Sequence, residues 1–267
     1  MASTQRPRDS VIISTKACGY NNRYDWFRDS GEGTQLTKAQ ICESVDKSLA
    51  RLNTDYVDLF QFHWPERSVG LTGMSEGKAR SREMASFETQ VEAIGELLQA
   101  GKIRHWGLSN ENVEGVEAFL KVCKELGVAQ PVCMQNAYNL LQRGDEQDLI
   151  LALGHDAGMG EKPEEVPAVG YLSYSPLSGG VLSGKYSVTR QKKVAGDKPK
   201  RSRLKLVKGY EESFLQSSGP AAVEAYVQVA KKHGITPSQL SIGLCNSRAF
   251  VTSTVVGAPI PFPVPPS

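Results

Sequence analysis

The sequence predicts a parallel α/β fold of the barrel type, and three observations support that expectation. Short runs rich in β-branched residues alternate with helical patterns along the chain, as in repeated βα units. The length of 267 residues suits one large domain, and a barrel of roughly 250 residues is a common single-domain size. Hydrophobic residues make up 40% of the chain and charged residues 22%, which is typical of a globular protein.

The first two expected elements are a strand and a helix joined by a polar loop. The β-branched run Val11–Thr15 predicts the strand, and a loop rich in Gly, Asn and Asp follows over residues 18–33. Thr37 and Gln40 have the spacing of a capping box, which predicts that a helix begins there. Apolar residues then recur at helical spacing as far as Leu52.

The second strand is expected at Val57–His63. Its alternation places four side chains on one face: Val57, Leu59, Gln61 and His63. The polar residues 65–85 are expected to form a mobile loop on the same rim as His63. A second helix is expected between Ser86, a candidate cap, and Gly101, which is placed to end it.

The later strands are expected at four further runs: Arg104–Ser109, Val132–Gln135, Val169–Ser175 and Thr254–Gly257. A helix is expected between Val113 and Gly127, and a shorter helical pattern covers Asp148–Leu153. Residues 178–219 are basic and contain glycine, so this long stretch is expected to be rich in loops.

Two helices close the pattern. Pro220 suits the first turn of one of them, which is expected to end before Gly234. Thr236 and Gln239 have the spacing of a second capping box, with Pro237 at the first helical position. The sequence therefore predicts helices on both sides of residue 235.

The pattern contains about six strands, whereas an eight-stranded barrel needs two more. No room for them is found before Val11 or after Ala258. We therefore expect an incomplete barrel in a single, partial domain over residues 1–267. Residues 259–267 form a proline-rich tail that is not expected to continue a helix or a strand.

Composition excludes several classes of function. The formal net charge is +2, so nothing in it favours nucleic acid or an anionic membrane as a partner. No run of about 18 apolar residues predicts a membrane span, and the N-terminus lacks a secretory signal. The five scattered cysteines predict free thiols in a reducing compartment, the cytoplasm or else an organelle. The oligomeric state stays open.

Polar and aromatic residues stand where the expected strands end, which is where parallel barrels carry their chemistry. They are Lys16, His63, Ser109, Asn110, Gln135, Tyr174 and Ser175. This set has no carboxylate cluster and no metal-ligand spacing, so no metal is expected. Ser, Asn and Gln can hydrogen-bond a carboxamide, an aromatic ring can stack on a flat heterocycle, and a lysine can lower the pKa of a neighbour.

The segments that hold these residues resemble the aldo-keto reductase family, in its bacterial-type and potassium-channel β-subunit-like branch. Six segments carry the resemblance in order along the chain: IISTK, SLARLNTDYVDLFQFHWP, LLQAGKIRHWGLSN, QNAYNLLQR, YSPLSGGVLSGKY and TPSQLSIGLC with FVTSTVVGA. The resemblance implies a (β/α)8 barrel and NADP(H)-dependent reduction of aldehydes or ketones to alcohols, with a small carbonyl compound as substrate.

The resemblance also implies a catalytic tetrad of Asp, Tyr, Lys and His. Lys16 matches the lysine and His63 matches the histidine. The family's aspartate and tyrosine belong to elements that would precede Val11. By this comparison the chain is truncated at both ends, without the first two strands and the last helix of the barrel. Catalysis is therefore expected to be impaired, because the tyrosine is the proton donor.

The cofactor site is implied more fully. By resemblance, Ser109, Asn110 and Gln135 hold the nicotinamide carboxamide, and Tyr174 stacks on the nicotinamide ring. The phosphates and the adenine end are implied at six further residues: Ser175, Leu177, Gly179, Lys185, Arg203 and Gly257. Two other interpretations stay open, a non-catalytic remnant that binds a nucleotide or a protein, and a fragment from a truncated isoform or gene model.

Overall fold

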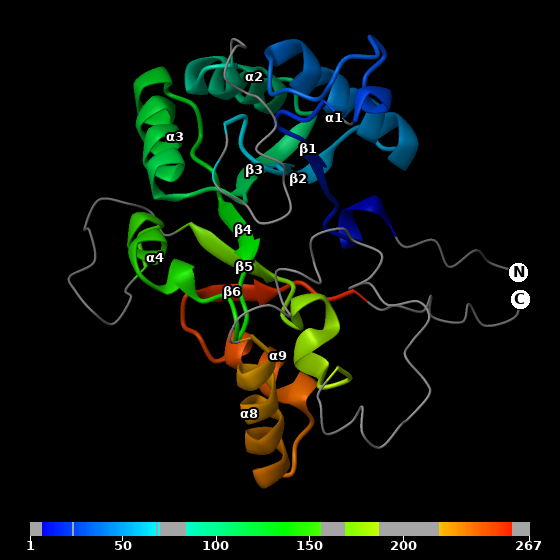
Figure 1. The fold of residues 1–267 in the computed structure, drawn as a ribbon. Coiled ribbons are helices and arrows are strands. Elements are labelled where there is room, and N and C mark those ends of the chain that lie inside the picture. The colour runs from blue at the N-terminus through cyan, green and yellow to red at the C-terminus, as the bar shows by residue number, and fades with distance from the viewer. Residues whose placement is uncertain are drawn as a thin grey trace, which may run out of the picture. The chain divides into compact units, whose positions relative to one another are not determined.

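The computed structural model describes residues 7–22, 24–67, 69, 84–155, 169–186 and 219–257. The chain divides into two compact units, and Figure 1 shows the elements of each. The first unit comprises Met1–Gln135 and Asp148–Gly170, and the second comprises Asn136–Gln147 and Tyr171–Ser267.

The described residues contain six strands, and hydrogen-bonded neighbours follow the order of the chain from β1 to β6. They are β1 Ser14–Ala17, β2 Val57–Phe62, β3 Ile103–Ser109, β4 Cys133–Ala137, β5 Gly170–Tyr174 and β6 Val251–Thr254. The pairs β1–β2, β2–β3, β3–β4 and β5–β6 are all parallel. The predicted parallel α/β fold is thereby confirmed, with strands near all six predicted positions.

The largest differences from the predicted strand bounds occur in the first and the last strand, because pairing rather than β propensity decides where a strand begins. The strand predicted at Val11–Thr15 begins only at Ser14, where Ser14 meets Leu59 in register. Ile12 lies before that pairing and is 84% exposed. The last strand likewise begins at Val251, opposite Tyr171, three residues before the prediction.

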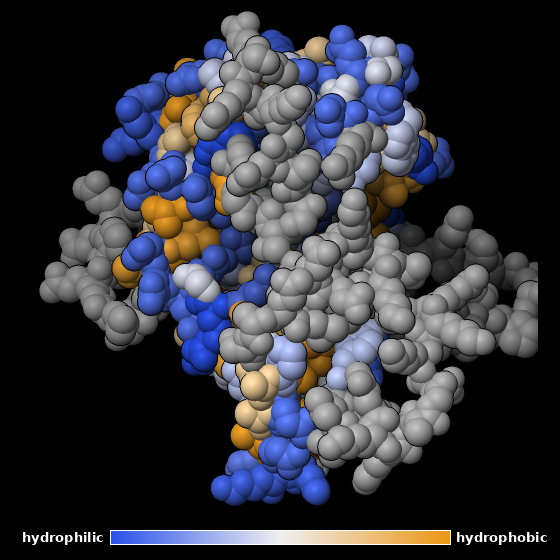
Figure 2. All heavy atoms as spheres, in the orientation of Figure 1, coloured by the Kyte–Doolittle hydropathy of each residue, from blue (hydrophilic) through white to orange (hydrophobic). Residues whose placement is uncertain are grey.

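Helices of the first unit cover its strands. They are α1 Lys38–Leu52, α2 Phe87–Gln99, α3 Val113–Leu126 and the short α4 Asp148–Ala152, with 3₁₀ turns η1 Arg8–Ser10 and η2 Asp25–Phe27. Helix α1 packs on β1 and on α2, and α2 packs on β3 and on α3 (Figure 1). Figure 2 shows mainly hydrophilic side chains over α1, whereas hydrophobic side chains are also visible over α3 and α4.

The predicted helix caps of the first unit are present, with one difference in detail. The side chains of Thr37 and Ser86 accept hydrogen bonds from the first turns of α1 and α2. Gly101 has a φ of +69° beyond the end of α2, as its predicted role requires. The box at Thr37 is only half formed, because Gln40 Oε1 accepts from Gln35 N at 2.7 Å and Arg28 Nε at 2.8 Å instead.

The second unit holds the other helices, η4 Gly144–Glu146, η5 Ser178–Ser183, α8 Gly219–Lys232 and α9 Pro237–Asn246. Helix α9 packs on α8, on β6 and on η5. The predicted capping box of Thr236 and Gln239 is complete, with Pro237 in the first turn. The loop expected over residues 178–219 contains η5, and its remainder from residue 187 to 218 lies outside the described residues, as does most of the 65–85 stretch.

Each unit has its own aromatic core. In the first, Phe62 of β2 contacts Trp106 and Phe119, with ring centroids 5.8 and 5.9 Å apart. In the second, Tyr138, Tyr171 and Phe250 pack edge to face. Strand β2 is buried at both Phe60 and Gln61, whose side chains alternate between the two faces. Burial on both faces is expected for a parallel sheet covered by helices.

Candidate active site

Lys16 lies inside β1, one residue before the strand ends, and pairs in register with Gln61 of β2. Removal of the ammonium from water lowers the pKa of Lys16 below 10.5, while the neighbouring Cys133 acts weakly in the opposite direction. A charge in such a partly apolar place acts on its neighbours more strongly than it would in water. Lys16 is therefore placed to tune the acidity of groups around it.

His63 follows β2 directly and is tied to the end of β1. Its backbone N–H donates to Ala17 O at 2.7 Å. Burial, and to a lesser degree the charge of Lys16, lowers the pKa of His63 from 6.5 to about 4. The imidazole is consequently neutral at physiological pH. The effect of Lys16 on His63 is the electrostatic signature of two side chains that share one site.

Cys18 adds a contact that fixes how the imidazole can act. Cys18 Sγ lies 3.6 Å from His63 Nδ1. Burial raises the pKa of Cys18 to about 11, so this group is a thiol rather than a thiolate. A thiol that donates to Nδ1 leaves the proton of the neutral ring on Nε2. In that tautomer His63 donates through Nε2, whereas with the proton on Nδ1 the imidazole would donate to Cys18 Sγ instead.

Ser109, Asn110 and Gln135 meet where β3 and β4 pair. Ser109 is in register with Gln135, and Ser109 Oγ donates to Gln135 O at 2.7 Å. Asn110 has a left-handed backbone with a φ of +56°, and its N–H also donates to Gln135 O, at 3.1 Å. Asn110 Nδ2 donates to His63 O at 2.7 Å. The three amide and hydroxyl residues are thus connected to the histidine.

The second unit carries the residues that follow β5. Tyr174 ends the strand, and Ser175 then takes a φ of +54°. Gly179 lies inside η5 with a φ of +64°. Ser175 O accepts from Ser178 N at 2.8 Å, while Leu182 N donates to Leu177 O at 3.1 Å. These bonds define a tight turn directly after the strand.

Lys185 lies over the backbone of this turn. A Cβ at Gly180, whose φ is +98°, would come within 2.8 Å of Lys185 Nζ. The ammonium also lies 5.0 Å from the ring centroid of Tyr186, within cation–π range. Only glycine allows the lysine to approach the main chain at this point. Lys185 therefore places a positive charge beside the turn after β5.

The sequence-predicted site residues are distributed over both units. The first unit brings together Lys16, His63, Ser109, Asn110 and Gln135. The second unit carries the others that are described: Tyr174, Ser175, Leu177, Gly179, Lys185 and Gly257. Gly257 follows β6, and an added Cβ there would meet nothing within 4 Å. Arg203 lies outside the described residues.

Sequence reasoning missed several contacts around Lys16 and His63. Cys18 contacts the imidazole, and Gln61 Nε2 donates to Cys133 Sγ at 3.6 Å beneath Lys16. Arg67 binds the carboxylate of Glu111, the residue after Asn110. Only Gln61 carried a signal in the sequence, because strand alternation placed it on the face of His63. The other contacts join residues that are far apart along the chain.

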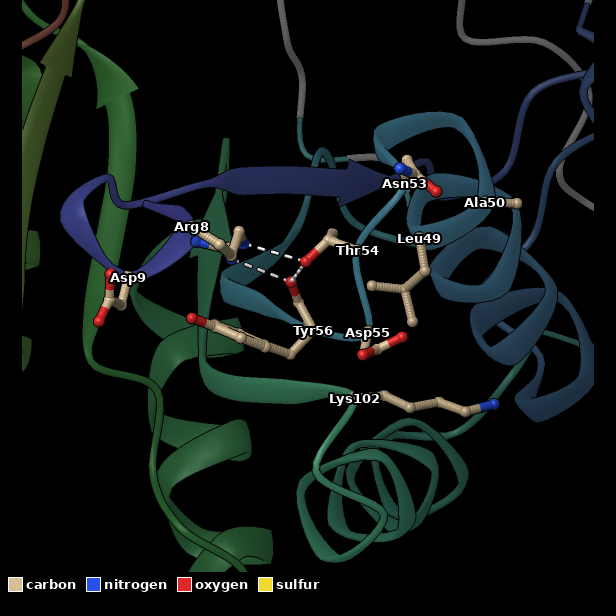
Figure 3. Close-up of a pocket in the computed structure, with 9 residues that line it drawn as sticks. All are labelled: Arg8, Asp9, Leu49, Ala50, Asn53, Thr54, Asp55, Tyr56 and Lys102. Atoms are coloured by element: carbon tan, nitrogen blue, oxygen red, sulfur yellow. Dashed lines mark hydrogen bonds between the residues drawn. The ribbon is translucent and has the colours of Figure 1, made fainter. Parts of the chain in front are cut away.

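A groove of about 930 Å³ lies at the opposite ends of the strands, where β2 and β3 begin (Figure 3). Its Arg8 is fully engaged: Nε donates to Thr54 Oγ1, Nη1 to Val11 O, and Nη2 to Tyr56 O and Asp58. The guanidinium groups of Arg8 and Arg104 also lie over the Tyr56 ring, at 4.1 and 3.9 Å from its centroid. In a parallel barrel this end serves stability rather than catalysis, so the groove is not the candidate active site.

Neither a metal cluster nor a membrane-spanning helix occurs in the described part of the chain. Among those residues, no group of three or more His, Cys, Asp or Glu side chains is arranged to hold a metal ion. None of the described helices combines the length and the apolar character needed to cross a bilayer.

Comparisons with known proteins agree with this geometry. A family model described as the aldo/keto reductase family matches residues 1–260. An aldo-keto reductase from Babesia bovis is 34% identical over 258 residues, which are 93% of this chain and 85% of that protein. Protein tas from Escherichia coli (strain K12) is 32% identical over 255 residues, 94% of this chain and 67% of that protein.

A probable voltage-gated potassium channel subunit beta from Oryza sativa subsp. japonica is also similar, at 26% identity over 253 residues, 94% of this chain and 65% of that protein. This chain therefore spans about two thirds of the length of the bacterial and rice proteins. The six parallel strands are consistent with the (β/α)8 barrel of the matching family. The predicted family is confirmed, and the chain belongs to the aldo/keto reductase family.

Proposed function

We propose that this protein is an NADPH-dependent oxidoreductase that reduces an aldehyde or ketone to an alcohol, with Lys16 and His63 at its catalytic centre. The observation that carries the proposal is the coupling of these two residues. They lie at the C-terminal ends of neighbouring strands, and the charge of Lys16 contributes to the lowered pKa of His63. Family membership supports the reaction class.

The two side chains suit the polarisation of a carbonyl group. A neutral His63 with its proton on Nε2 would donate a hydrogen bond to the carbonyl oxygen and orient it. The Lys16 ammonium would stabilise negative charge that develops on the same oxygen and would lower the pKa of a proton donor beside it. Bound NADPH would supply the hydride, and a water molecule beside Lys16 would supply the proton to the resulting alkoxide.

The residues beside this pair suit a nicotinamide carboxamide, which offers both hydrogen-bond donors and an acceptor. Ser109 and Asn110 supply a hydroxyl and an amide. Gln135, which is in register with Ser109, supplies a second amide beside them. We propose that these three residues hold the nicotinamide.

In the second unit, we propose that Tyr174 stacks on the nicotinamide ring and that Ser175, Leu177, Gly179 and Lys185 follow the pyrophosphate. The positive charge of Lys185 beside a glycine turn supports a phosphate at this place. Arg203 and Gly257 are proposed to contact the 2′-phosphate side of the cofactor. Each of these contacts with the cofactor is proposed for its own residue and does not depend on the others.

The experiment measures NADPH binding and turnover with the same preparation. Binding is followed by calorimetry, and turnover by NADPH absorbance with 4-nitrobenzaldehyde as carbonyl substrate. We expect Lys16→Met to lower kcat by roughly 10²–10⁴-fold, the range for loss of acid–base assistance, with little change in NADPH affinity. Lys121→Met is the matched control, because Lys121 on α3 is largely exposed and forms an ion pair with the exposed Glu125.

A Lys16→Met variant as active as the unsubstituted protein would sink the assignment of Lys16. A second function is nucleotide binding without turnover; it is supported by the similarity to a protein whose name describes a probable channel subunit rather than an enzyme. Tight NADPH binding without turnover of any tested aldehyde would support that second function. Absence of both binding and turnover would overturn both proposals.

We also propose a reducing compartment, such as the cytoplasm, as the location of the protein. All five cysteines are free thiols in the structure, although three of them are buried.

A further inference from the structure

We propose that the ion pair of Arg67 and Glu111 is a positioning device for the nicotinamide end of NADPH, because it fixes the backbone from which Asn110 reaches the cofactor. This inference rests on the proposed function and deepens it. Neither residue is proposed to touch the cofactor. Both act through Asn110.

The pair is built as a strong, nearly buried contact. Glu111 is 2% exposed at its side chain, and Arg67 is 24% exposed. Arg67 Nη1 donates to Glu111 Oε2 at 2.9 Å and Nη2 donates to Oε1 at 2.6 Å. This two-pronged geometry fixes orientation as well as distance, which a single contact does not. The pair therefore holds its two backbone segments in one arrangement.

Those two segments are the ones that follow β2 and β3. Arg67 comes four residues after His63, and Glu111 comes directly after Asn110. The same segments are joined a second time by Asn110 Nδ2, which donates to His63 O at 2.7 Å. The link through Asn110 belongs to the candidate site, and the link through Arg67 and Glu111 supports it from the neighbouring residues.

Asn110 leaves β3 with its backbone in the left-handed region, at a φ of +56°, so the direction of its side chain depends on how the residues after it are held. This region is unfavourable for most L-residues and persists where surrounding contacts determine it. Glu111 Oε1 accepts from Asn112 N at 2.8 Å, and Arg67 Nη2 donates to Asn112 Oδ1 at 2.5 Å. The pair thus fixes the residues immediately after Asn110.

Helix α3 leaves space for this arrangement. Asn112 is the N-cap of α3, and its side chain accepts from Gly115 N at 3.1 Å. A Cβ at Gly115 would lie 2.3 Å from the Glu111 carboxylate and 2.4 Å from Arg67 Nη2. The pair therefore occupies the volume that any larger residue would need. Arg67 also lies 5.5 Å from the ring of Phe87, so it is packed as well as paired.

The test separates positioning of the nicotinamide from a general structural role. Affinities for NADPH and for 2′-phospho-ADP-ribose, which lacks the nicotinamide, are measured by calorimetry on the full chain. We expect Glu111→Gln to weaken NADPH binding at least tenfold and to change 2′-phospho-ADP-ribose binding less than twofold. Arg67→Lys, which keeps the charge but not the fork, should weaken NADPH binding in the same selective way by a smaller factor.

The matched control is Glu125→Gln, which removes an exposed carboxylate from the other end of the same helix and should change neither affinity. Equal losses for the two ligands, or no loss for either, would overturn the inference while leaving the proposed function intact. If the unsubstituted chain binds neither ligand, the proposed function fails and the inference fails with it. Thermal unfolding of each variant identifies a misfolded protein. If Glu111→Gln is misfolded, the affinities of Arg67→Lys for the two ligands decide the test.

Discussion

At His63, burial and a neighbouring charge act in the same direction on one titration. Both disfavour the imidazolium and lower the pKa of His63 to about 4. The ring is then neutral across the physiological range, with one nitrogen as a hydrogen-bond donor and the other as an acceptor, and Cys18 Sγ is the contact of Nδ1. A histidine of this kind orients a substrate rather than exchanging protons with water near pH 7.

The lowered pKa of His63 predicts how stability depends on pH. Above pH 6.5 the histidine is neutral in both the folded and the unfolded chain. Between pH 6.5 and about pH 4 the unfolded chain binds a proton that the folded one does not, so the free energy of unfolding falls as the pH falls. In His63→Gln the free energy of unfolding should fall by about 2 kcal/mol less between pH 7 and pH 4.5 than in the unsubstituted protein. Urea unfolding at the two pH values measures this difference.

His233→Gln provides the comparison for that experiment, because His233 is exposed. If His63→Gln and the unsubstituted chain lose the same stability on acidification, the proposed burial of a neutral imidazole is wrong.

At the scale of elements, the sequence determines the start of a helix most directly. In α9 the Thr236 side chain accepts from Gln239 N at 3.1 Å, and the Gln239 side chain accepts from Thr236 N at 2.8 Å. Both bonds join residues three apart, so the sequence pattern alone determines them. This helix packs against β6 and η5, so its start also sets the packing of the turn after β5.

Thr236→Ala should lower the free energy of unfolding by about 1 kcal/mol, because the backbone N–H of Gln239 loses the hydroxyl that accepts its hydrogen bond. Chemical unfolding followed by circular dichroism measures the change. Ser238 lies two residues after Thr236, in the first turn of α9. Ser238→Ala keeps the cap and should leave the free energy of unfolding unchanged or raise it slightly. Equal destabilisation by both substitutions would mean that packing, and not capping, dominates at this end of α9.

The sequence predicts the elements better than it predicts the contacts between them. The alternation of β-branched runs with helical patterns locates all six strands, and the caps locate the starts of helices. The resemblance locates Lys16 and His63. The start of β1 was misplaced because pairing with Leu59 begins at Ser14, whereas Val11–Ile13 have the same β propensity. The Arg67–Glu111 pair joins residues 44 positions apart, and no local spacing signals such a contact. Distant partners become visible only when the chain is folded.

At the scale of the whole chain, the three tryptophans report very different surroundings. Trp106 is 1% exposed and Trp64 is 8% exposed, whereas Trp26 is 71% exposed. All three belong to the first unit. Intrinsic fluorescence therefore monitors the folding of that unit, while circular dichroism monitors the helices of both.

Trp26→Phe should remove most of the emission that acrylamide quenches in the native protein, because this indole alone of the three is largely in solvent. The remaining emission should be blue-shifted and should move to the red on unfolding in urea. Trp106→Phe is the contrasting variant and should leave quenching nearly unchanged while destabilising the core by a few kcal/mol. Strong quenching that persists in Trp26→Phe would show that Trp64 or Trp106 is accessible.

The left-handed backbone at Asn110 also limits how this site can diverge. Asn, Asp and Gly are the residues that occupy such a conformation at low cost, so the chemical alphabet at position 110 is short. Position 110 can therefore present an amide, a carboxylate or no side chain. Ser109 and Gln135 lie in extended strands without that restriction. Adaptation of this protein to a different nicotinamide geometry would therefore proceed through those two neighbours, with position 110 as the constant element.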